Sequence, residues 1–327
     1  MPAYYAIRKD PTSGNKVDAM AEEVDKSFET LRFSGDLPAK AGDEGAFTPS
    51  SREQKTYHAF ILREAVKVST GLFPKVSAVF EGVKSKLGLG SGVECFIRAE
   101  AKITASCCNL GESFKSGREP LVAVVLTSGI VETMEEGELA FVVGHELGHF
   151  LFEHRACPLP KEDDTELEIL QAMQLSRAAE ISSDRIGFIC CGGDDPCARM
   201  ETGFRAILKT VSGLSGEHFR ADLPAYLDQL RENEDILKYS AEIWSTHPMF
   251  PLRVKALNLF SMSQAYYDWA GREDRAPIST EKLDKMVKAD KKTEKNARAA
   301  QFDSGVWKEV MAMEMSKKSK KKKSQNK

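Results

Sequence analysis

The segment that most constrains this chain is His145-Glu146-Leu147-Gly148-His149, which follows the apolar run from Leu139 to Val143. The apolar run predicts a buried helix that continues through the segment. Residues four apart lie on one face of a helix, about 6 Å from each other, so both imidazoles can turn toward one metal ion. Glu146 follows the first histidine by about 100° of helical rotation, which lets its carboxylate reach a water held by that ion. We therefore expect a metal site on this helix.

The alternative is that His145 and His149 face solvent on an amphipathic helix. The chain holds only six histidines, and this pair lies in apolar sequence rather than on a charged face. Burying an imidazole and a carboxylate there without partners would cost on the order of several kcal/mol, so a metal or hydrogen bonds must satisfy them. Gly144 and Gly148 are also four apart, and they leave a flat strip where another backbone can approach.

The composition is that of an ordinary soluble globular protein. Of the 327 residues, 42% are apolar and 29% are charged. No apolar run reaches the roughly 18–20 residues that span a bilayer, and the first residues, Met1 to Tyr5, lack the pattern of a signal peptide. The seven cysteines are odd in number and unevenly clustered, which favours reduced thiols over a disulfide framework. We expect a cytoplasmic protein without a membrane span.

The charge is unevenly distributed along the chain. The last eleven residues, Lys317 to Lys327, hold seven lysines and no acidic residue, so the net charge of −3 leaves −3 − 7 = −10 on the rest. Such a run either binds nucleic acid or anionic lipid, or forms a disordered, solubilising terminus. We favour the second interpretation and expect no specific nucleic-acid partner.

The pattern along the chain predicts an α+β fold that is mainly helical, with a small β-sheet. Val93 to Ala99 and Leu121 to Thr127 are rich in β-formers and predict strands, and Cys107 to Gly111 predicts a turn between them. Apolar residues at helical spacing predict a helix from Ser50 to Leu72. Further helices are predicted over 74–87, 164–190, 196–212, 223–237 and 252–267, with an amphipathic stretch over 17–33 and a charged, Lys-rich run over 280–300.

A zinc site that acts on a substrate usually takes three protein ligands and leaves the fourth position to water. A metzincin would carry Gly at 152 and His at 155, but this chain has Phe152 and Arg155, which excludes that class. His154 lies five residues after His149 and would point about 140° away from it on a helix. We therefore expect His154 to be a surface or capping histidine.

The better candidate for a third ligand is Glu180, which is followed by Asp184 in an E-x-x-x-D pattern on a second predicted helix. Glu180 would complete a His-His-Glu set, and Asp184 could accept the other ring N–H of a ligand histidine and fix its tautomer. The alternative is a solvated acidic helix face. It fits Glu166 and Glu168 better, because small and apolar residues surround Glu180.

Three segments together resemble a known family. Glu138–His149, Ala179–Arg185 and Thr246-His247-Pro248 followed by Arg253 are similar to motifs of the gluzincin zinc metallopeptidases of the HtpX and type I CAAX prenyl protease family, and the likeness covers about Ser91 to Leu259. It implies a zincin-like metallopeptidase domain with the H-E-x-x-H sequence on its active-site helix. We place this domain at 50–265, between a peripheral N-terminal segment (1–49) and a C-terminal helical extension (266–315) that precedes a disordered Lys-rich tail (316–327).

The resemblance also implies a metal and its ligands. One zinc ion per chain would be held by His145, His149 and Glu180. Glu146 would act as general base and then as general acid. The implied activity is that of a zinc-dependent metalloendopeptidase acting on peptide or protein substrates.

Further residues take implied roles around the zinc. Asp184 would hold a ligand histidine in place, whereas His247 and Arg253 would approach the substrate carbonyl and stabilise the oxyanion. The strand from Leu121 to Thr127 is either an edge on which an extended peptide pairs or an ordinary core strand. Because well-known members of the family carry membrane helices near the active site and this chain shows none, we expect a soluble, stand-alone member. The alternative function is a catalytically idle zinc-binding module used for interaction or regulation, and the oligomeric state stays open.

Overall fold

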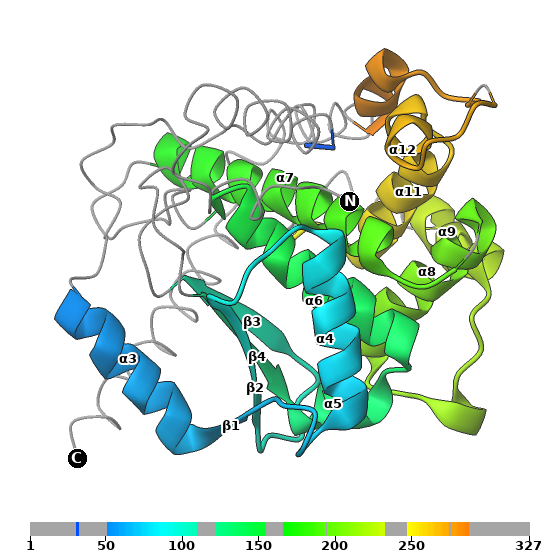
Figure 1. The fold of residues 1–327 in the computed structure, drawn as a ribbon. Helices are drawn as coiled ribbons and strands as arrows, with labels where there is room; N and C mark the ends of the chain where they lie inside the picture. Colours follow the sequence, from blue (N-terminus) through cyan, green and yellow to red (C-terminus); the bar gives the residue numbers. More distant parts are fainter. Residues whose placement is uncertain are drawn as a thin grey trace, which may run out of the picture.

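The computed structural model describes residues 31–32, 51–109, 122–154, 166–193, 195–232, 247–274 and 276–287. These residues form a mainly helical fold with a small mixed sheet, in agreement with the predicted α+β class (Figure 1). The predicted Lys-rich tail (316–327) and nearly all of the predicted peripheral segment (1–49) lie outside the described residues.

Most helices begin and end close to their predicted positions. In chain order they are α3 (Ser51–Glu64), α4 (Pro74–Lys86), α5 (Ser128–Thr133), α6 (Glu136–Leu151), α7 (Glu166–Cys190), α8 (Pro196–Ser212), α9 (Leu223–Glu232), α11 (Phe250–Ser261) and α12 (Gln264–Trp269). The strands are β1 (Ala65–Lys67), β2 (Val93–Arg98), β3 (Ala105–Asn109) and β4 (Val122–Thr127). A further helical stretch covers 280–287, the described part of the predicted Lys-rich run.

The predicted helix from Ser50 to Leu72 is wrong beyond Glu64. There the chain changes into β1, which pairs antiparallel with β2. Val66 and Val68 are β-branched, so they lose side-chain freedom in a helix and fit an extended chain. The apolar periodicity therefore spans a helix and a strand.

The sheet has the order β1-β2-β4-β3, in which β2 and β4 are parallel and the other pairs are antiparallel. β4 is an inner strand and all six of its residues are buried, as its apolar sequence requires. The interpretation of Leu121 to Thr127 as an edge strand is therefore wrong. The turn predicted over 107–111 is also wrong over 107–109, because these residues belong to β3, which ends the described sheet. Ala, Ser, Cys and Asn are weak strand formers, so pairing with β4 determines this strand.

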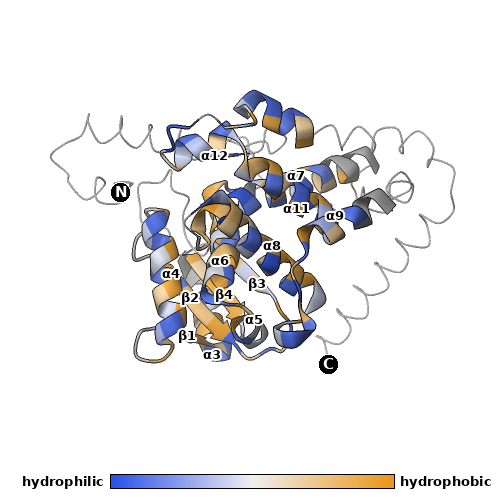
Figure 2. Ribbon diagram, turned by 90° about the vertical axis from the view of Figure 1, so that its right-hand side faces the viewer, coloured by the Kyte–Doolittle hydropathy of each residue, from blue (hydrophilic) through white to orange (hydrophobic). Residues whose placement is uncertain are grey.

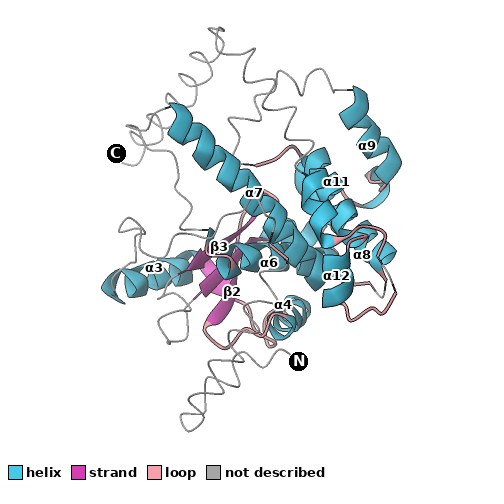
Figure 3. Cartoon of the chain, turned by 90° about the horizontal axis from the view of Figure 1, so that it is seen from above, coloured by secondary structure: helices cyan, strands magenta, loops and turns pink. Residues whose placement is uncertain are grey.

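Helices cover both faces of the sheet. Alternate residues of β4 face opposite sides. Val122, Val124 and Leu126 join the main core with α4 and α6, whereas Ala123 and Val125 join a smaller cluster that includes Ile61 of α3. Figures 1 and 3 show the sheet between α3 on one side and α4 with α6 on the other. Helix α6 is thereby enclosed between the sheet and α7.

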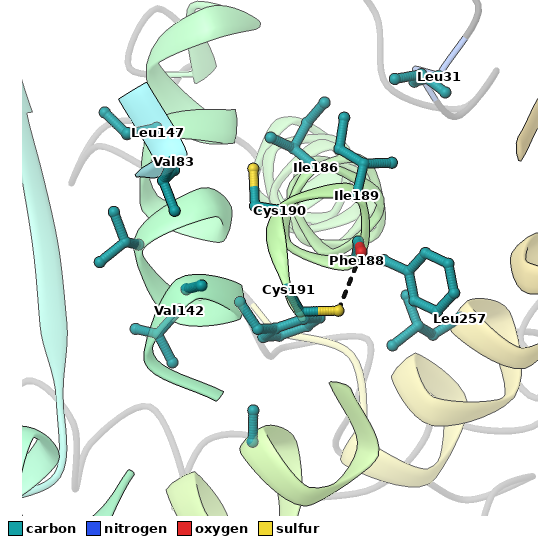
Figure 4. Packing of buried hydrophobic residues seen from close by; sticks show 14 of the residues in the cluster. Leu31, Val83, Val142, Leu147, Ile186, Phe188, Ile189, Cys190, Cys191 and Leu257 are labelled. Atoms are coloured by element: carbon teal, nitrogen blue, oxygen red, sulfur yellow. Dashed lines mark hydrogen bonds between the residues drawn. The ribbon is translucent and has the colours of Figure 1, made fainter. Parts of the chain in front are cut away.

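Helices α6 and α7 approach each other closely at two glycines. A Cβ on Gly144 would lie 2.6 Å from Cβ of Cys190, and a Cβ on Gly148 would lie 3.0 Å from Cα of Ser183. The predicted flat strip is therefore confirmed, and α7 is the backbone that uses it. Figure 4 shows Ile186 and Cys190 on the side of α7 that faces α6.

The C-terminal segment belongs to the same core as α6 and α7, to which it contributes Tyr266, Ile278 and Leu283. The single helix predicted over 252–267 is broken before α12, because the Ser263 side chain accepts a hydrogen bond from the backbone of Tyr266 and caps a new helix. The predicted boundary at 265/266 falls within this packed region, and the division into domains stays a prediction.

Apolar residues are concentrated on β2, β4 and α6 (Figure 2). Among the described helices, none combines the length and the apolar character needed to cross a bilayer.

Candidate metal centre

Helix α6 is fixed at its N-terminus before it reaches the histidine pair. Glu135 and Glu138 form a capping box, in which each side chain accepts a hydrogen bond from the other's backbone N–H. The residues from Leu139 to Gly144 that follow are all buried. The helix therefore runs through the core and carries His145 and His149 in its C-terminal half.

The two histidines turn their Nε2 atoms toward the same point. These atoms lie 3.2 Å apart. Glu180 of α7 completes the group, with Oε1 3.3 Å from His149 Nε2 and Oε2 3.5 Å from His145 Nε2. One possible ligand atom from each of the three residues lies within 4.8 Å of the others. The structure thus brings together the three residues that the sequence singled out as ligands.

Asp184 lies one turn after Glu180 and contacts the far side of His145. Its Oδ1 is 2.9 Å from His145 Nδ1, the kind of contact that the sequence predicted. Arg253 of α11 donates to the same carboxylate from Nε (2.8 Å to Oδ2) and from Nη2 (2.6 Å to Oδ1). Its Nη1 lies 3.4 Å from Glu180 Oε2. The guanidinium therefore links the two carboxylates of α7.

His154 is buried, so the prediction of a surface or capping histidine is wrong. Its exposed fraction is 8%, and its Nδ1 lies 2.9 Å from His149 Nδ1 and 3.3 Å from Ser183 Oγ. The helical projection fails because α6 ends at Leu151. Glu153 then adopts a left-handed conformation, with φ of 54°, and the chain turns back toward His149.

Burial and charge oppose each other in this cluster. Burial alone raises the pKa of Glu180, but the hydrogen bond to His149 and the charge of Arg253 outweigh it, so that pKa lies well below its ordinary value. Burial lowers the pKa of His149, yet the hydrogen bond to Glu180 and its charge raise that pKa overall. The pairing of His149 with Glu180 therefore favours the charged forms of both side chains.

A cavity of about 220 Å³ is lined by His145 and Glu180, two of the three predicted ligands. Glu146 and His247 line it, and the side chain of His247 is 59% exposed, with Nε2 3.5 Å from Glu180 Oε1. The remaining wall includes Arg253, Thr104, the first residue of β3 (Ala105) and a largely apolar surface: Ile130, Phe141, Val142, Ile207, Thr210 and Phe250. The position of Glu146 is thus open to a molecule in the cavity.

The donor set fits a zinc ion. Two imidazoles and one carboxylate form a zinc donor set that leaves a further position for water. Each imidazole also has its second nitrogen held by a neighbour, as ligand histidines do. Within the part of the chain that the structure describes, no other group of three His, Cys, Asp or Glu side chains converges in this way. The cysteines there are not paired in disulfides and lie outside this group.

Comparison with known proteins agrees with the location of this centre. Residues 107–159 match the model of peptidase family M48. The matched segment contains the H-E-x-x-H residues and His154, and it ends before Glu180. No curated protein and no solved structure matches the chain. Through the segment that carries the histidine pair, the chain is similar to the metallopeptidases of family M48.

Proposed function

We propose that the protein is a zinc-dependent metalloendopeptidase. The observation that carries the proposal is the convergence of His145, His149 and Glu180 beside a cavity that Glu146 lines. The match to peptidase family M48 along this helix supports it. We assign one zinc ion per chain to these three side chains.

Bound zinc would lower the pKa of water and polarise the scissile carbonyl. We assign the proton transfers to Glu146. Its carboxylate would take a proton from the attacking water and deliver it to the nitrogen of the leaving amine. Glu146 lies between the two histidines in the sequence and on the cavity wall, which supports this assignment.

His247 and Arg253 differ in how they can serve the reaction. His247 is exposed on the cavity wall, so we assign it to the oxyanion that develops on the substrate carbonyl. Arg253 uses two donor nitrogens on Asp184. We therefore assign Arg253 first to holding Asp184 and Glu180 in place, and Asp184 to holding His145.

An extended peptide is the substrate that the geometry favours. β3 ends the described sheet beside the cavity, and Thr104 and Ala105 form part of the wall. A peptide added along β3 would gain main-chain hydrogen bonds. The apolar wall around Phe141 and Ile207 would then accept an apolar side chain next to the scissile bond.

Turnover of casein or a peptide mixture by Glu146→Gln tests the proposal. The substitution keeps the size of the side chain and removes the base, so we expect turnover to fall about 10²–10⁴-fold while zinc content is unchanged. Glu136→Gln, at an exposed position in the first turn of α6, is the control and should leave both unchanged. Equal turnover by Glu146→Gln and the wild type would rule out the assigned mechanism.

The subfamily of the protein and its location in the cell stay proposals. Placement in the HtpX and type I CAAX prenyl protease group rests on the segments at 179–185 and 246–253, which lie outside the matched residues. A cytoplasmic, stand-alone protein rests on the cysteine pattern and on the lack of a long apolar run in the sequence. The alternative of a catalytically idle zinc-binding module predicts a wild type that holds zinc and cleaves no peptide.

A further inference from the structure

We propose that His154 is a positioning residue that holds His149 in the tautomer and orientation needed to bind a metal ion. The inference rests on the proposed function, because it concerns the same centre. It assigns a role to a residue that neither the H-E-x-x-H spacing nor the E-x-x-x-D pattern includes.

His149 presents its two ring nitrogens to different neighbours. Nε2 lies 3.3 Å from Glu180 Oε1, where the predicted ligands meet, and Nδ1 lies 2.9 Å from Nδ1 of His154. A ring nitrogen that binds a metal uses its lone pair, so the proton of the neutral ring must be on the other nitrogen. His149 Nδ1 is then the donor, and His154 Nδ1 is the acceptor.

The backbone is bent to place His154 there. After α6 ends at Leu151, Glu153 adopts φ of 54°, a left-handed conformation that costs a residue other than glycine about 1–2 kcal/mol. Such a conformation persists where the surrounding structure fixes it. Here it directs His154 back to the last turn of α6.

The neighbours of His154 also fix its ring. The ring centroid lies 5.6 Å from that of Phe152, and Ser183 Oγ lies 3.3 Å from Nδ1. Ser183 directly precedes Asp184, which contacts the other predicted ligand, His145. One short stretch of α7 therefore supports both histidines, one directly and the other through His154.

The two side chains that hold the predicted ligand histidines differ in charge. Asp184 offers His145 a carboxylate, which Arg253 neutralises through two hydrogen bonds. His154 offers His149 an imidazole nitrogen, which adds no negative charge beside Glu180. A second carboxylate at this position would need a cation of its own, because an unpaired buried charge is costly.

Zinc affinity of the apoprotein, measured by competition with a chromophoric chelator, tests the inference. We expect His154→Ala to bind zinc about 10–100-fold more weakly than the wild type. His154→Asn should recover most of the affinity, because its amide oxygen can accept the same hydrogen bond. His218→Ala, at an exposed histidine of the short helix Gly216–His218, is the control and should bind like the wild type.

Two further readouts separate positioning from general destabilisation. The absorption bands of the cobalt-loaded protein should shift in His154→Ala and return in His154→Asn, whereas thermal unfolding of the apoproteins reports stability alone. Wild-type zinc affinity in His154→Ala, or an equal loss in both variants, would overturn the inference. A wild type that binds no zinc would instead refute the proposed function. If His154→Ala does not fold, His154→Asn decides, since an affinity loss of 10-fold or more (about 1.4 kcal/mol or more) there overturns the inference.

Discussion

A cluster of buried ionisable side chains lies at each end of helix α6, and the two clusters are built differently. Near the N-terminus, Glu138 is 1% exposed and both of its carboxylate oxygens accept from cations. Lys209 Nζ lies 2.6 Å from Oε2, and Arg205 Nε lies 2.8 Å from Oε1. This cluster is closed, and it joins α6 to α8.

Toward the C-terminus of α6, the buried carboxylates of Glu180 and Asp184 contact imidazoles as well as a guanidinium. Glu180 and Asp184 also share the guanidinium of Arg253, and the group faces a cavity of about 220 Å³. The comparison teaches that burial of charge alone does not indicate a functional site. Imidazoles and a carboxylate that converge beside open space do, because they leave room for a metal and a substrate.

The largest expected effect breaks the closed cluster. Among the described residues, Glu138→Gln leaves Lys209 buried with no carboxylate partner, which we expect to lower the free energy of unfolding by about 3–5 kcal/mol. Urea unfolding measures this, with Glu136→Gln as the exposed control. Turnover per folded molecule should not change. If Glu138→Gln lost turnover without losing stability, the closed cluster would have a functional role, and the contrast between the two clusters would be wrong.

A smaller effect is expected when the cluster beside the cavity (the open cluster: His145, His149, Glu180, Asp184 and Arg253) loses a charge. Asp184→Asn keeps an acceptor for His145 but removes the charge that holds Arg253, so zinc affinity should fall about 10–100-fold. Asp268→Asn, at an exposed aspartate of α12, serves as the control. Unchanged affinity in a folded Asp184→Asn protein would contradict the role assigned to Asp184.

The smallest effect concerns the apolar cavity wall. Thr210 lines the cavity from an exposed position on α8, so Thr210→Phe should narrow the space with little effect on folding. We expect kcat/KM for peptides with a large apolar side chain at the scissile bond to fall about 10-fold relative to peptides with alanine there. Val211→Phe changes the next, 46% exposed residue and should not alter this preference. An equal change of this peptide preference in Thr210→Phe and Val211→Phe would mean that the cavity does not select the substrate.

The arrangement of the candidate metal centre was predictable because its signals are local. The spacing of His145 and His149, and that of Glu180 and Asp184, places side chains on one face of a helix whatever the rest of the fold does. The glycine pair in α6 indicated a close neighbour in the same way. The partner of Arg253 was not predictable, because α11 reaches Asp184 only through the tertiary structure.

The predictions from the sequence fail where the structure depends on residues that are distant in the chain. The prediction for His154 fails because it extends the helix past Leu151. The chain turns back at Glu153, and no glycine or proline at that position signals the turn. The sequence of β3 has few strand-forming residues, so its strand was not predicted. The inner position of β4 depends on the order of the strands in the sheet, which the local sequence pattern does not determine.

Zinc content is the most direct test of the central claim that the open cluster is a metal centre. After dialysis against a weak chelator, wild-type protein and the folded fraction of Glu138→Gln should each hold one zinc per chain, whereas Glu180→Ala should hold almost none. The contrast uses one buried glutamate from each cluster. Zinc retained by Glu180→Ala at the wild-type level, or a wild type that holds none, would contradict the account.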